Sequence, residues 1–234
     1  MKKRSKRYKT LVQIVETGRK YTLEKAIEIL KQSPSVKFDE SIEVSLKLGV
    51  DTKRSDQQVR STFFLPHGSG KQISVVVLAK QEKAKEALEV GADEAGGQEL
   101  IDKIKSGWTD FDVLVATPDM MREVGQLGKI LGPRGLMPTP KAGSVTTDVK
   151  GAVKDLKRGK IEFKVDKNGV VNNCVGKLSF PMNYIVENIE SFLYAVFKAK
   201  PISSKGHFFR SLFISSTMGA GLKIDIHSLS LKLD

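Results

Sequence analysis

The sequence predicts a mixed α/β fold in which a discontinuous two-layer α/β sandwich is interrupted by an inserted three-layer α/β domain. Three observations predict this arrangement. Alternating strands occur near both chain ends, continuous apolar strands alternate with helices only in the middle, and positive charge is concentrated outside the middle. We expect one domain with an antiparallel-rich sheet from residues 1–67 and 160–234, and an inserted domain from residues 68–159.

The charge partition narrows the class of partner. Residues 68–159 contain 14 Lys or Arg and 13 Asp or Glu, whereas the two flanks contain 25 and 14, which leaves +1 in the middle and +11 outside. An excess of this size favours a polyanionic partner such as RNA, DNA or an anionic membrane surface. The middle and the flanks are therefore expected to have different roles.

Several classes of protein are excluded by composition. The longest apolar run, Ile73–Ala79, is far shorter than the about 20 residues that cross a bilayer, and no signal-peptide apolar region follows the basic N-terminus. We expect a soluble, cytoplasmic protein with no membrane partner. Cys174 is the single cysteine, and the three histidines share no metal-ligand spacing, so we expect no disulfide, no metal and no cofactor.

The N-terminal part predicts two helices followed by two strands. Apolar residues recur on one helical stripe from Tyr8 to Val15, and Thr22 caps a second helix that stops before Pro34. The alternation over Ser41–Leu48 predicts a half-exposed strand with its even-numbered residues inward. A second strand is predicted at Val59–Leu65.

The middle changes to the pattern of a Rossmann-like unit, a parallel sheet covered on both faces. Continuous apolar strands are predicted at Ile73–Ala79 and Val113–Ala116. The intervening helices are predicted at residues 82–90, 98–105, 119–124 and 149–158.

Residues 125–146 contain five glycines and three prolines, a density that predicts a fixed loop rather than a helix or a strand. The cations of this Gly/Pro segment, Lys129, Arg134 and Lys141, suit either phosphate contact or docking against another part of the protein. Because the segment lies in the near-neutral middle, we assign them mainly to shaping the inserted domain or its contact with the flanking domain.

The C-terminal part predicts a return to antiparallel pairing. Residues 161–165 and 170–177 flank the turn Asp166–Gly169, whose Asn-Gly pair is a strong hairpin signal. An amphipathic helix is predicted at Tyr184–Ala199. The last strands are predicted at residues 208–218 and 222–226.

No catalytic group stands out from the sequence. The run Gly68–Lys71 lacks the spacing of a phosphate-binding loop and leads into a strand, so we interpret it as belonging to a hinge. The hinge residues are Pro66, His67 and Gly68 at one boundary and Gly159 at the other. A nucleotide-dependent enzyme centred on the inserted sheet and a protein-interaction adaptor are the competing classes, because a parallel sheet offers a crevice for a nucleotide.

Four stretches carry a resemblance to a known family. They are Val36–Glu43, the run from Asp56 to Gly68, the stretch Ser215–Gly219 and, within the Gly/Pro segment, the signature Gly132, Pro133, Arg134, Gly135, Leu136, Met137 and Pro138. Together they resemble the bacterial ribosomal protein L-one family, the stalk proteins of the large ribosomal subunit. The similarity covers essentially the full chain, with departures at Ala220, where Pro is usual, and at Ser144, where Thr is usual.

The resemblance implies a function. The discontinuous domain would bind large-subunit (23S) rRNA and form the mobile stalk near the E site, where deacylated tRNA is released. The protein would be no enzyme, would contact E-site tRNA, would repress its own operon by binding a similar mRNA structure, and would be a monomer when free. The implied RNA-contact residues are Lys37, Phe38, Ser41, Glu43, Lys164, Asp166, Lys167, Ser211, Ser215, Thr217, Met218 and Gly219.

The pattern of the last long strand agrees with this surface. Ser211, Ser215 and Thr217 share one face by period two, whereas Leu212 and Ile214 point to the other. Short hydroxyls can exchange hydrogen bonds with a ribose 2′-OH, a contact that distinguishes RNA from DNA. A merely solvated strand face is the alternative interpretation.

Overall fold

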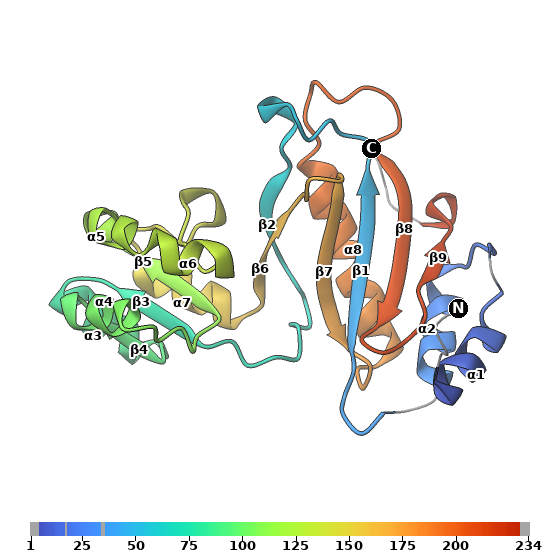
Figure 1. Cartoon of the computed structure of the whole chain (residues 1–234), viewed down its shortest axis with the longest axis horizontal. Helices are drawn as coiled ribbons and strands as arrows, with labels where there is room; N and C mark the ends of the chain where they lie inside the picture. Colours follow the sequence, from blue (N-terminus) through green and yellow to red (C-terminus); the bar gives the residue numbers. More distant parts are fainter. Residues whose placement is uncertain (1–4, 17, 34–35, 230–234) are drawn as a thin grey trace. The chain divides into compact units, whose positions relative to one another are not determined.

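The computed structural model describes residues 5–16, 18–33 and 36–229 of the chain, so Pro34, the predicted stop of the second helix, lies outside the described residues. The chain divides into two compact units (Figure 1). Unit 1 combines Met1–Gly70 with Glu162–Asp234, and unit 2 is Lys71–Ile161. These divisions fall a few residues from the expected boundaries, with the first crossover after Gly70 rather than at Gly68.

Unit 1 contains a four-stranded antiparallel sheet in the order β7-β1-β8-β9. Its strands are β1 (Ser41–Leu48), β7 (Val170–Lys177), β8 (Phe209–Ser216) and β9 (Leu222–Ile224). The helices of this unit are α1 (Lys6–Ile14), α2 (Leu23–Gln32) and α8 (Met182–Lys198). In Figure 1, α8 passes behind β7 and β1, and β1 lies between β7 and β8.

One face of this sheet is buried under α2 and α8. Along β1 the even-numbered residues from Ile42 to Leu48 are at most 1% exposed, as predicted, and Leu212 and Ile214 of β8 are buried beside them. Ile27 of α2 and Phe192 of α8 are buried in the same layer. The opposite face, the open face, carries the odd-numbered residues of β1 together with Ser211, Phe213 and Ser215 of β8; Glu43 and Phe213 are exposed there. Unit 1 is therefore the expected two-layer sandwich.

The predicted hairpin over residues 161–177 is wrong as a paired ladder. The turn forms, because the Asp166 N–H donates to the Val170 carbonyl at 2.8 Å and Gly169 adopts φ 76°. Beyond it the strands separate: β6 (Lys160–Lys164) pairs with β2 (Arg60–Phe64), whereas β7 pairs with β1. A strong turn signal thus specified the turn without specifying the partners of the two strands.

Unit 2 is a three-layer arrangement around a parallel sheet in the order β4-β3-β5. The strands are β3 (Val75–Leu78), β4 (Glu94–Gly96) and β5 (Val113–Ala116), and the helices are α3 (Gln81–Glu89), α4 (Gln98–Lys105), α5 (Met121–Gln126), α6 (Gly128–Arg134) and α7 (Val149–Lys157). Val76 and Leu78 face a core with α4, α5 and α6, whereas Val75 and Val77 face a second core with α3 and α7. This is the Rossmann-like unit that the sequence predicts; the short edge strand β4 was not predicted because Glu94-Ala95-Gly96 has no apolar run.

The Gly/Pro segment was predicted as a loop, and that prediction is wrong over Gly128–Arg134, which form α6. Pro133 lies in the last turn of α6, so its missing N–H costs the helix a single backbone bond. Gly135, at φ 73°, closes the helix: its N–H donates to the Gly132 carbonyl and the Leu136 N–H donates to the Leu131 carbonyl. Leu131 is fully buried in the core of unit 2, so tertiary packing outweighs the weak helix propensity.

The remaining regular segments are short 3₁₀ turns at Ser55–Gln57, Pro118–Met120, Pro140–Ala142 and Ile226–Ser228. Within the described ranges, no helix is both long and apolar enough to cross a membrane. The same residues contain no group of three or more His, Cys, Asp or Glu side chains that could hold a metal ion.

Candidate nucleic-acid interface

Eight of the predicted contact residues gather where β1 begins and β8 ends. We call this group the Ser41 corner; it consists of Lys37, Phe38, Ser41, Glu43, Ser215, Thr217, Met218 and Gly219. The antiparallel register places Glu43 opposite Ser215 and Ile42 opposite Ser216. The Thr217 N–H then donates to the Ser41 carbonyl at 3.0 Å and continues the pairing past the end of β8.

The Thr217 hydroxyl is engaged on both sides by the backbone of Ser41. Its oxygen accepts from the Ser41 N–H at 3.0 Å and lies 3.3 Å from the Ser41 carbonyl oxygen, to which it can donate. A hydroxyl has one donor and two acceptor positions, so one acceptor position of this exposed side chain is left for a ligand. Thr217 therefore both fixes the corner and offers an acceptor at its surface.

The buried carboxylate of Glu40 stabilises the turn after β8. The Met218 N–H donates to Glu40 Oε2 at 2.9 Å, and Glu40 is only 4% exposed. The Gly219 N–H donates to the Ser216 carbonyl, and a Cβ on Gly219 would stand 2.3 Å from Ser216 Oγ, so glycine permits this close approach. Glu40 was missed in the sequence because its partner is far along the chain.

The same turn presents apolar side chains to solvent. Met218 is 47% exposed and Phe38, on the segment that leads into β1, is 54% exposed. Large exposed apolar side chains beside polar ones are typical of binding surfaces. The Ser41 corner thus combines hydroxyls, exposed apolar groups and a rigid backbone.

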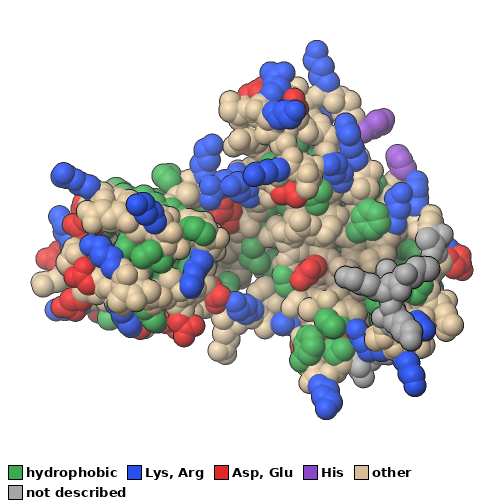
Figure 2. All heavy atoms as spheres, in the orientation of Figure 1, with side chains coloured by type: hydrophobic (Ala, Val, Ile, Leu, Met, Phe, Trp, Pro, Cys, Tyr) green, Lys and Arg blue, Asp and Glu red, His purple; other side chains and the backbone are tan. Residues whose placement is uncertain are grey.

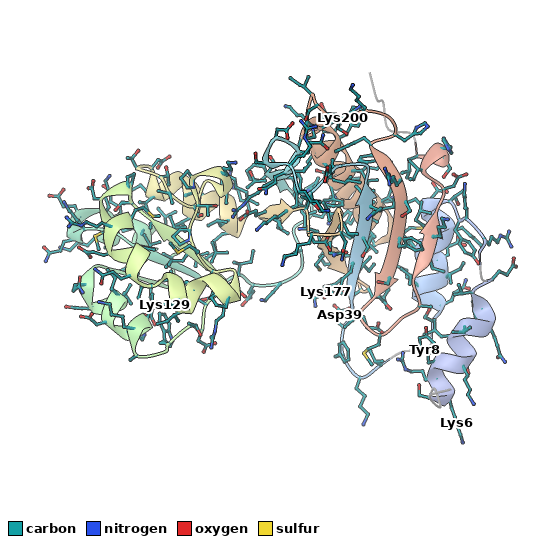
Figure 3. The ribbon with its side chains drawn as sticks, turned by 45° about the horizontal axis from the view of Figure 1, so that its top comes forward. Lys6, Tyr8, Asp39, Lys129, Lys177 and Lys200 are labelled. Carbon is teal, nitrogen blue, oxygen red and sulfur yellow. The ribbon has the colours of Figure 1, made fainter. Side chains whose placement is uncertain are left out.

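The structure adds two cations to the Ser41 corner, and neither was found from the sequence. Lys177 Nζ donates to Ser41 Oγ at 2.9 Å, and Arg7 Nη2 of α1 donates to the Met218 carbonyl at 3.0 Å. Figure 3 shows Lys177 beside Asp39, whose carboxylate accepts from the N–H and hydroxyl of Ser179. The pairing of Ser41 with Lys177 depends on the sheet order, which no local pattern reveals.

The other predicted contacts lie at the opposite end of β1, about 23 Å away along the eight-residue strand at about 3.3 Å per residue. Lys164 is the last residue of β6, and Asp166 and Lys167 lie in the turn that leads to β7, where the Gly169 carbonyl accepts from the Leu48 N–H. Asp166 Oδ1 accepts from the backbone N–H groups of Asn168 and Val170, so its carboxylate stabilises the turn itself. Ser211, opposite Lys47, also lies at this far end. The predicted set is therefore two groups joined by the open face.

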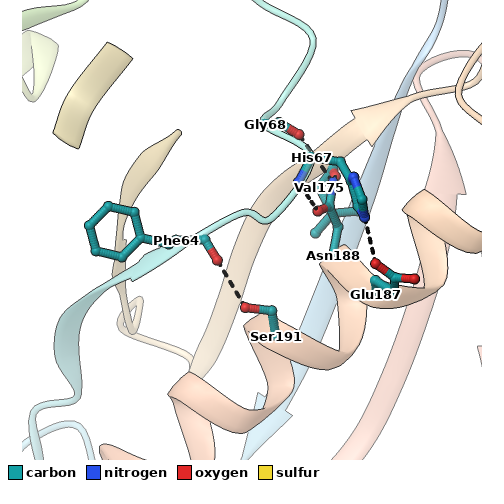
Figure 4. A network of polar contacts seen from close by, with 7 residues as sticks. All are labelled: Phe64, His67, Gly68, Val175, Glu187, Asn188 and Ser191. Atoms are coloured by element: carbon teal, nitrogen blue, oxygen red, sulfur yellow. Dashed lines mark hydrogen bonds and ion pairs between the residues drawn. The ribbon is translucent and has the colours of Figure 1, made fainter. Parts of the chain in front are cut away.

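The predicted hinge residues of the first crossover are anchored to α8 (Figure 4). The His67 N–H donates to Asn188 Oδ1, and Asn188 Nδ2 donates to the carbonyls of Gly68 and Val175 at 3.1 and 2.7 Å. The His67 ring stacks on Tyr184 with centroids 3.8 Å apart and contacts the Glu187 carboxylate. We call the segment His67–Gly68 the strap. Because Asn188 is fully buried, the strap is fixed within unit 1.

The other predicted hinge residues and the signature residues differ in how deeply they are buried. Gly159, at φ 102°, lies between α7 and β6, and Pro66 is exposed. Leu136 and Met137 of the signature pack against the core of unit 2. The signature residues Gly132, Pro133, Arg134 and Gly135 are exposed, whereas Pro138 is buried.

The cations of the Gly/Pro segment are exposed in unit 2. Within the described ranges, Lys129, Arg134 and Lys141 have no ion-pair or hydrogen-bond partner, so apolar packing rather than these charges shapes the segment. The run Gly68–Lys71, far from this segment in the sequence, leads into β3, and Lys71 Nζ contacts the Asp112 carboxylate. This use of Lys71 leaves no phosphate-binding loop there.

These features define a class of protein: a mixed α/β chain of two units whose most developed polar site is a rigid, cation-bearing sheet surface. The model of the ribosomal protein L1p/L10e family matches residues 29–220. The chain is 61% identical over 227 residues to the large ribosomal subunit protein uL1 of Protochlamydia amoebophila (strain UWE25), covering 97% of this chain and 96% of the relative.

Two more relatives carry the same name. The chain is 54% identical to the large ribosomal subunit protein uL1 of Chlamydia caviae, over 98% of this chain and 99% of the relative. It is 53% identical to that of Kosmotoga olearia, over 96% and 97%. The chain belongs to the ribosomal protein L1p/L10e family, and the resemblance identified from the sequence is confirmed.

Proposed function

We propose that this protein is a structural component of the large ribosomal subunit, that it binds large-subunit rRNA through unit 1, and that it is no enzyme. The observation that carries the proposal is the Ser41 corner, where hydroxyl, apolar and cationic groups from several elements are held together where β1 begins and β8 ends. The charge partition supports unit 1 as the RNA-binding domain and unit 2 as the inserted domain.

The corner has the groups that RNA recognition needs. The free acceptor position of Thr217 and the hydroxyl of Ser215 suit a ribose 2′-OH. Lys37 and Lys177 suit phosphates, which position a nucleic acid without reading its sequence. Phe38 and Met218 suit the apolar face of a base or a ribose. Because Glu43 is a carboxylate beside an anionic partner, its role would be to accept from a hydroxyl or a base amine.

The finer parts of the proposal rest on family membership. The protein would act in the cytoplasm as part of the mobile stalk near the E site, contacting E-site tRNA during release of deacylated tRNA. Free of the ribosome, it would be a monomer that represses its own operon through an mRNA structure similar to the rRNA site. Both RNAs would use the Ser41 corner, so they should compete for one protein molecule.

The far-end residues Lys164, Lys167 and Ser211 would extend the same contact along the open face. The hinge would lie on the unit 2 side of the anchored strap, after Gly70, and at Gly159 on the return crossover. This position follows because Asn188 already holds His67 and Gly68 to α8.

Binding of the full chain to a stalk-region transcript of large-subunit rRNA tests the proposal. Phe38→Ala and Met218→Ala should each weaken binding at least tenfold in a filter-binding assay, because each removes exposed apolar surface from the corner. Phe64→Ala is the matched control, since Phe64 is 47% exposed but lies on β2. Equal affinity of all three variants and the unchanged chain would contradict the proposal.

A further inference from the structure

Unit 1 has a second cation-rich feature, away from the Ser41 corner, where α8 ends and β8 begins. A groove of about 870 Å³ lies there, and its lining includes Phe209 and Ser211 together with the cations Lys20, Lys200, Lys205, Arg210 and Lys223. We call this the basic groove. Its volume is in the range of small-ligand sites. Figure 2 shows mainly Lys and Arg side chains over the upper part of unit 1.

The charges of the basic groove are not neutralised by the protein. Its single acidic residue is Asp225, which pairs with Lys20 at 4.0 Å and accepts from the His227 N–H. Within the described ranges, Lys205, Arg210 and Lys223 have no carboxylate partner. Unpaired cations that converge on a concave surface focus a positive potential and favour an anionic ligand.

The groove is held in a fixed shape by backbone contacts. The Gly49 N–H donates to the Phe208 carbonyl at 2.7 Å, and Ser204 Oγ donates to the Gly49 carbonyl at 3.3 Å. A Cβ on Gly49 would stand 2.3 Å from the His207 carbonyl oxygen, so the loop between α8 and β8 packs directly on this glycine. The carbonyls of the last turn of α8 accept from the N–H groups of Ala199 and Lys200, which limits their repulsion of an anion.

The groove also contains aromatic surface. Phe209 is half-buried, packs on Phe208 with ring centroids 5.4 Å apart, and meets Phe197 of α8 at 6.1 Å. Lys200, labelled at the end of α8 in Figure 3, lies 5.9 Å from the Phe208 ring. An aromatic surface beside unpaired cations is the combination that binds single-stranded nucleic acid, because bases stack while phosphates meet the cations.

We propose that the basic groove binds a single-stranded RNA segment, with phosphates on Lys200, Lys205 and Arg210 and a base against Phe209. The inference rests on the proposed function in that the occupant is an RNA strand. It goes beyond that function because the groove is separate from the Ser41 corner and needs no folded stalk RNA. Ser211 lines the groove and belongs to the open face, so one RNA can reach both.

A fluorescein-labelled oligouridylate of 12 nucleotides is the probe, measured by fluorescence anisotropy on the full chain. The variant carries Lys200→Gln, Lys205→Gln and Arg210→Gln. The matched control carries Lys85→Gln, Arg122→Gln and Lys154→Gln, three exposed unit 2 cations without a carboxylate partner in the described structure. Both variants lose three positive charges, so a difference between them reports position rather than net charge.

The groove variant should bind the probe at least tenfold more weakly than the control variant. The slope of log affinity against log salt should fall by about two, because each lost phosphate contact on a single strand contributes about 0.7. Equal affinities and slopes of the two variants would overturn the inference. A 4-thiouridine probe cross-linked to the unchanged chain gives a second readout, independent of variant folding: cross-links should map to Phe209 and its neighbours, and cross-links confined elsewhere would also overturn it.

The outcomes separate this inference from the proposed function. If the groove and control variants bind the oligouridylate equally while Phe38→Ala still weakens binding of the stalk-region transcript, the groove inference alone fails. If the groove binds the oligouridylate while the stalk-region transcript is not bound, the proposed function alone fails.

Discussion

Units 1 and 2 each place helices against a sheet, but they use the faces of the sheet differently. In unit 2, neighbouring residues of β3 such as Val76 and Val77 are buried on opposite sides, so both faces of the parallel sheet are occupied by core. In unit 1, β1 alternates between buried and accessible residues. A sheet with one covered face keeps the other for a ligand, and this difference favours unit 1 as the site of RNA contact.

The polar side chains of the two units differ in the same way. In unit 2, Asp93 and Asp112 turn toward the start of β3 and accept from the backbone N–H groups of Val75 and Ser74. In unit 1, Ser215 and Thr217 lie on the accessible side of the sheet. The carboxylates at the start of β3 thus maintain the fold of unit 2, as Glu40 does in unit 1, whereas the hydroxyls of Ser215 and Thr217 are placed where a partner can reach them.

The comparison predicts that the units unfold separately, and the largest expected effect tests this. Asn188→Ala should lower the free energy of unfolding of unit 1 by about 3 kcal/mol, because it strands the buried partners at His67, Gly68 and Val175. The unfolding of each unit can be followed by its own aromatic signal, since the single tryptophan, Trp108, lies in unit 2 and the four tyrosines lie in unit 1. Urea unfolding followed by the two signals measures each unit.

The tyrosine transition should move to lower urea while the Trp108 transition stays in place. Asn172→Ala is the control, because Asn172 is exposed on β7. An equal shift of both transitions would show that the two units unfold as one, which would contradict the prediction that they unfold separately.

Strand patterns were predictable from the sequence because they are local. The alternation over β1 matches the burial of its even-numbered residues, and α4 and β5 begin and end where predicted. Partner choice was not predictable: β6 and β7 share a turn yet pair with different strands. The Asn-Gly pair predicts the turn from local sequence, but the strand with which each of β6 and β7 pairs depends on contacts made far along the chain.

The site shows the same limit. The hydroxyls of β8 could be assigned to one face by their spacing, whereas Glu40, Lys177 and Arg7 join the corner only through the folded backbone. α6 was missed because its glycines and Pro133 argue against a helix, and the burial of Leu131 outweighs them.

A smaller effect is expected at the accessible face of unit 1. Thr217→Val should weaken binding of the stalk-region transcript by about 2 kcal/mol, because it removes the free acceptor position and the bonds to the Ser41 backbone. Thr217→Ser retains the hydroxyl and should retain most of the affinity. Filter binding gives the affinities, and thermal unfolding of both variants checks the fold. If the valine and serine variants bind alike, the hydroxyl has no part in RNA contact.

The smallest expected effect concerns the carboxylates of unit 2 at low pH. The Lys157 ammonium and the Val75 N–H hold the pKa of Asp93 below its ordinary value of 3.8, although burial opposes them. For Asp112, burial raises the pKa, but Lys71 and the Ser74 N–H together outweigh it and the net pKa is lowered. Because protons bind the unfolded state more tightly, this stabilisation is complete above the ordinary pKa and is lost as pH falls through the lower folded-state values.

Unit 2 should therefore lose stability as pH falls below about 4, through the range in which carboxyl groups ordinarily titrate. Asp93→Asn should lower its stability at pH 7 by at most about 1 kcal/mol, since the Asp93 side chain is 46% exposed and solvent screens the ion pair. The double variant Asp93→Asn with Asp112→Asn should flatten the pH dependence of the Trp108 urea midpoint. Asp110→Asn, an exposed control, should leave that dependence unchanged. An unaltered slope in the double variant would mean that groups other than Asp93 and Asp112 cause the acid sensitivity of unit 2.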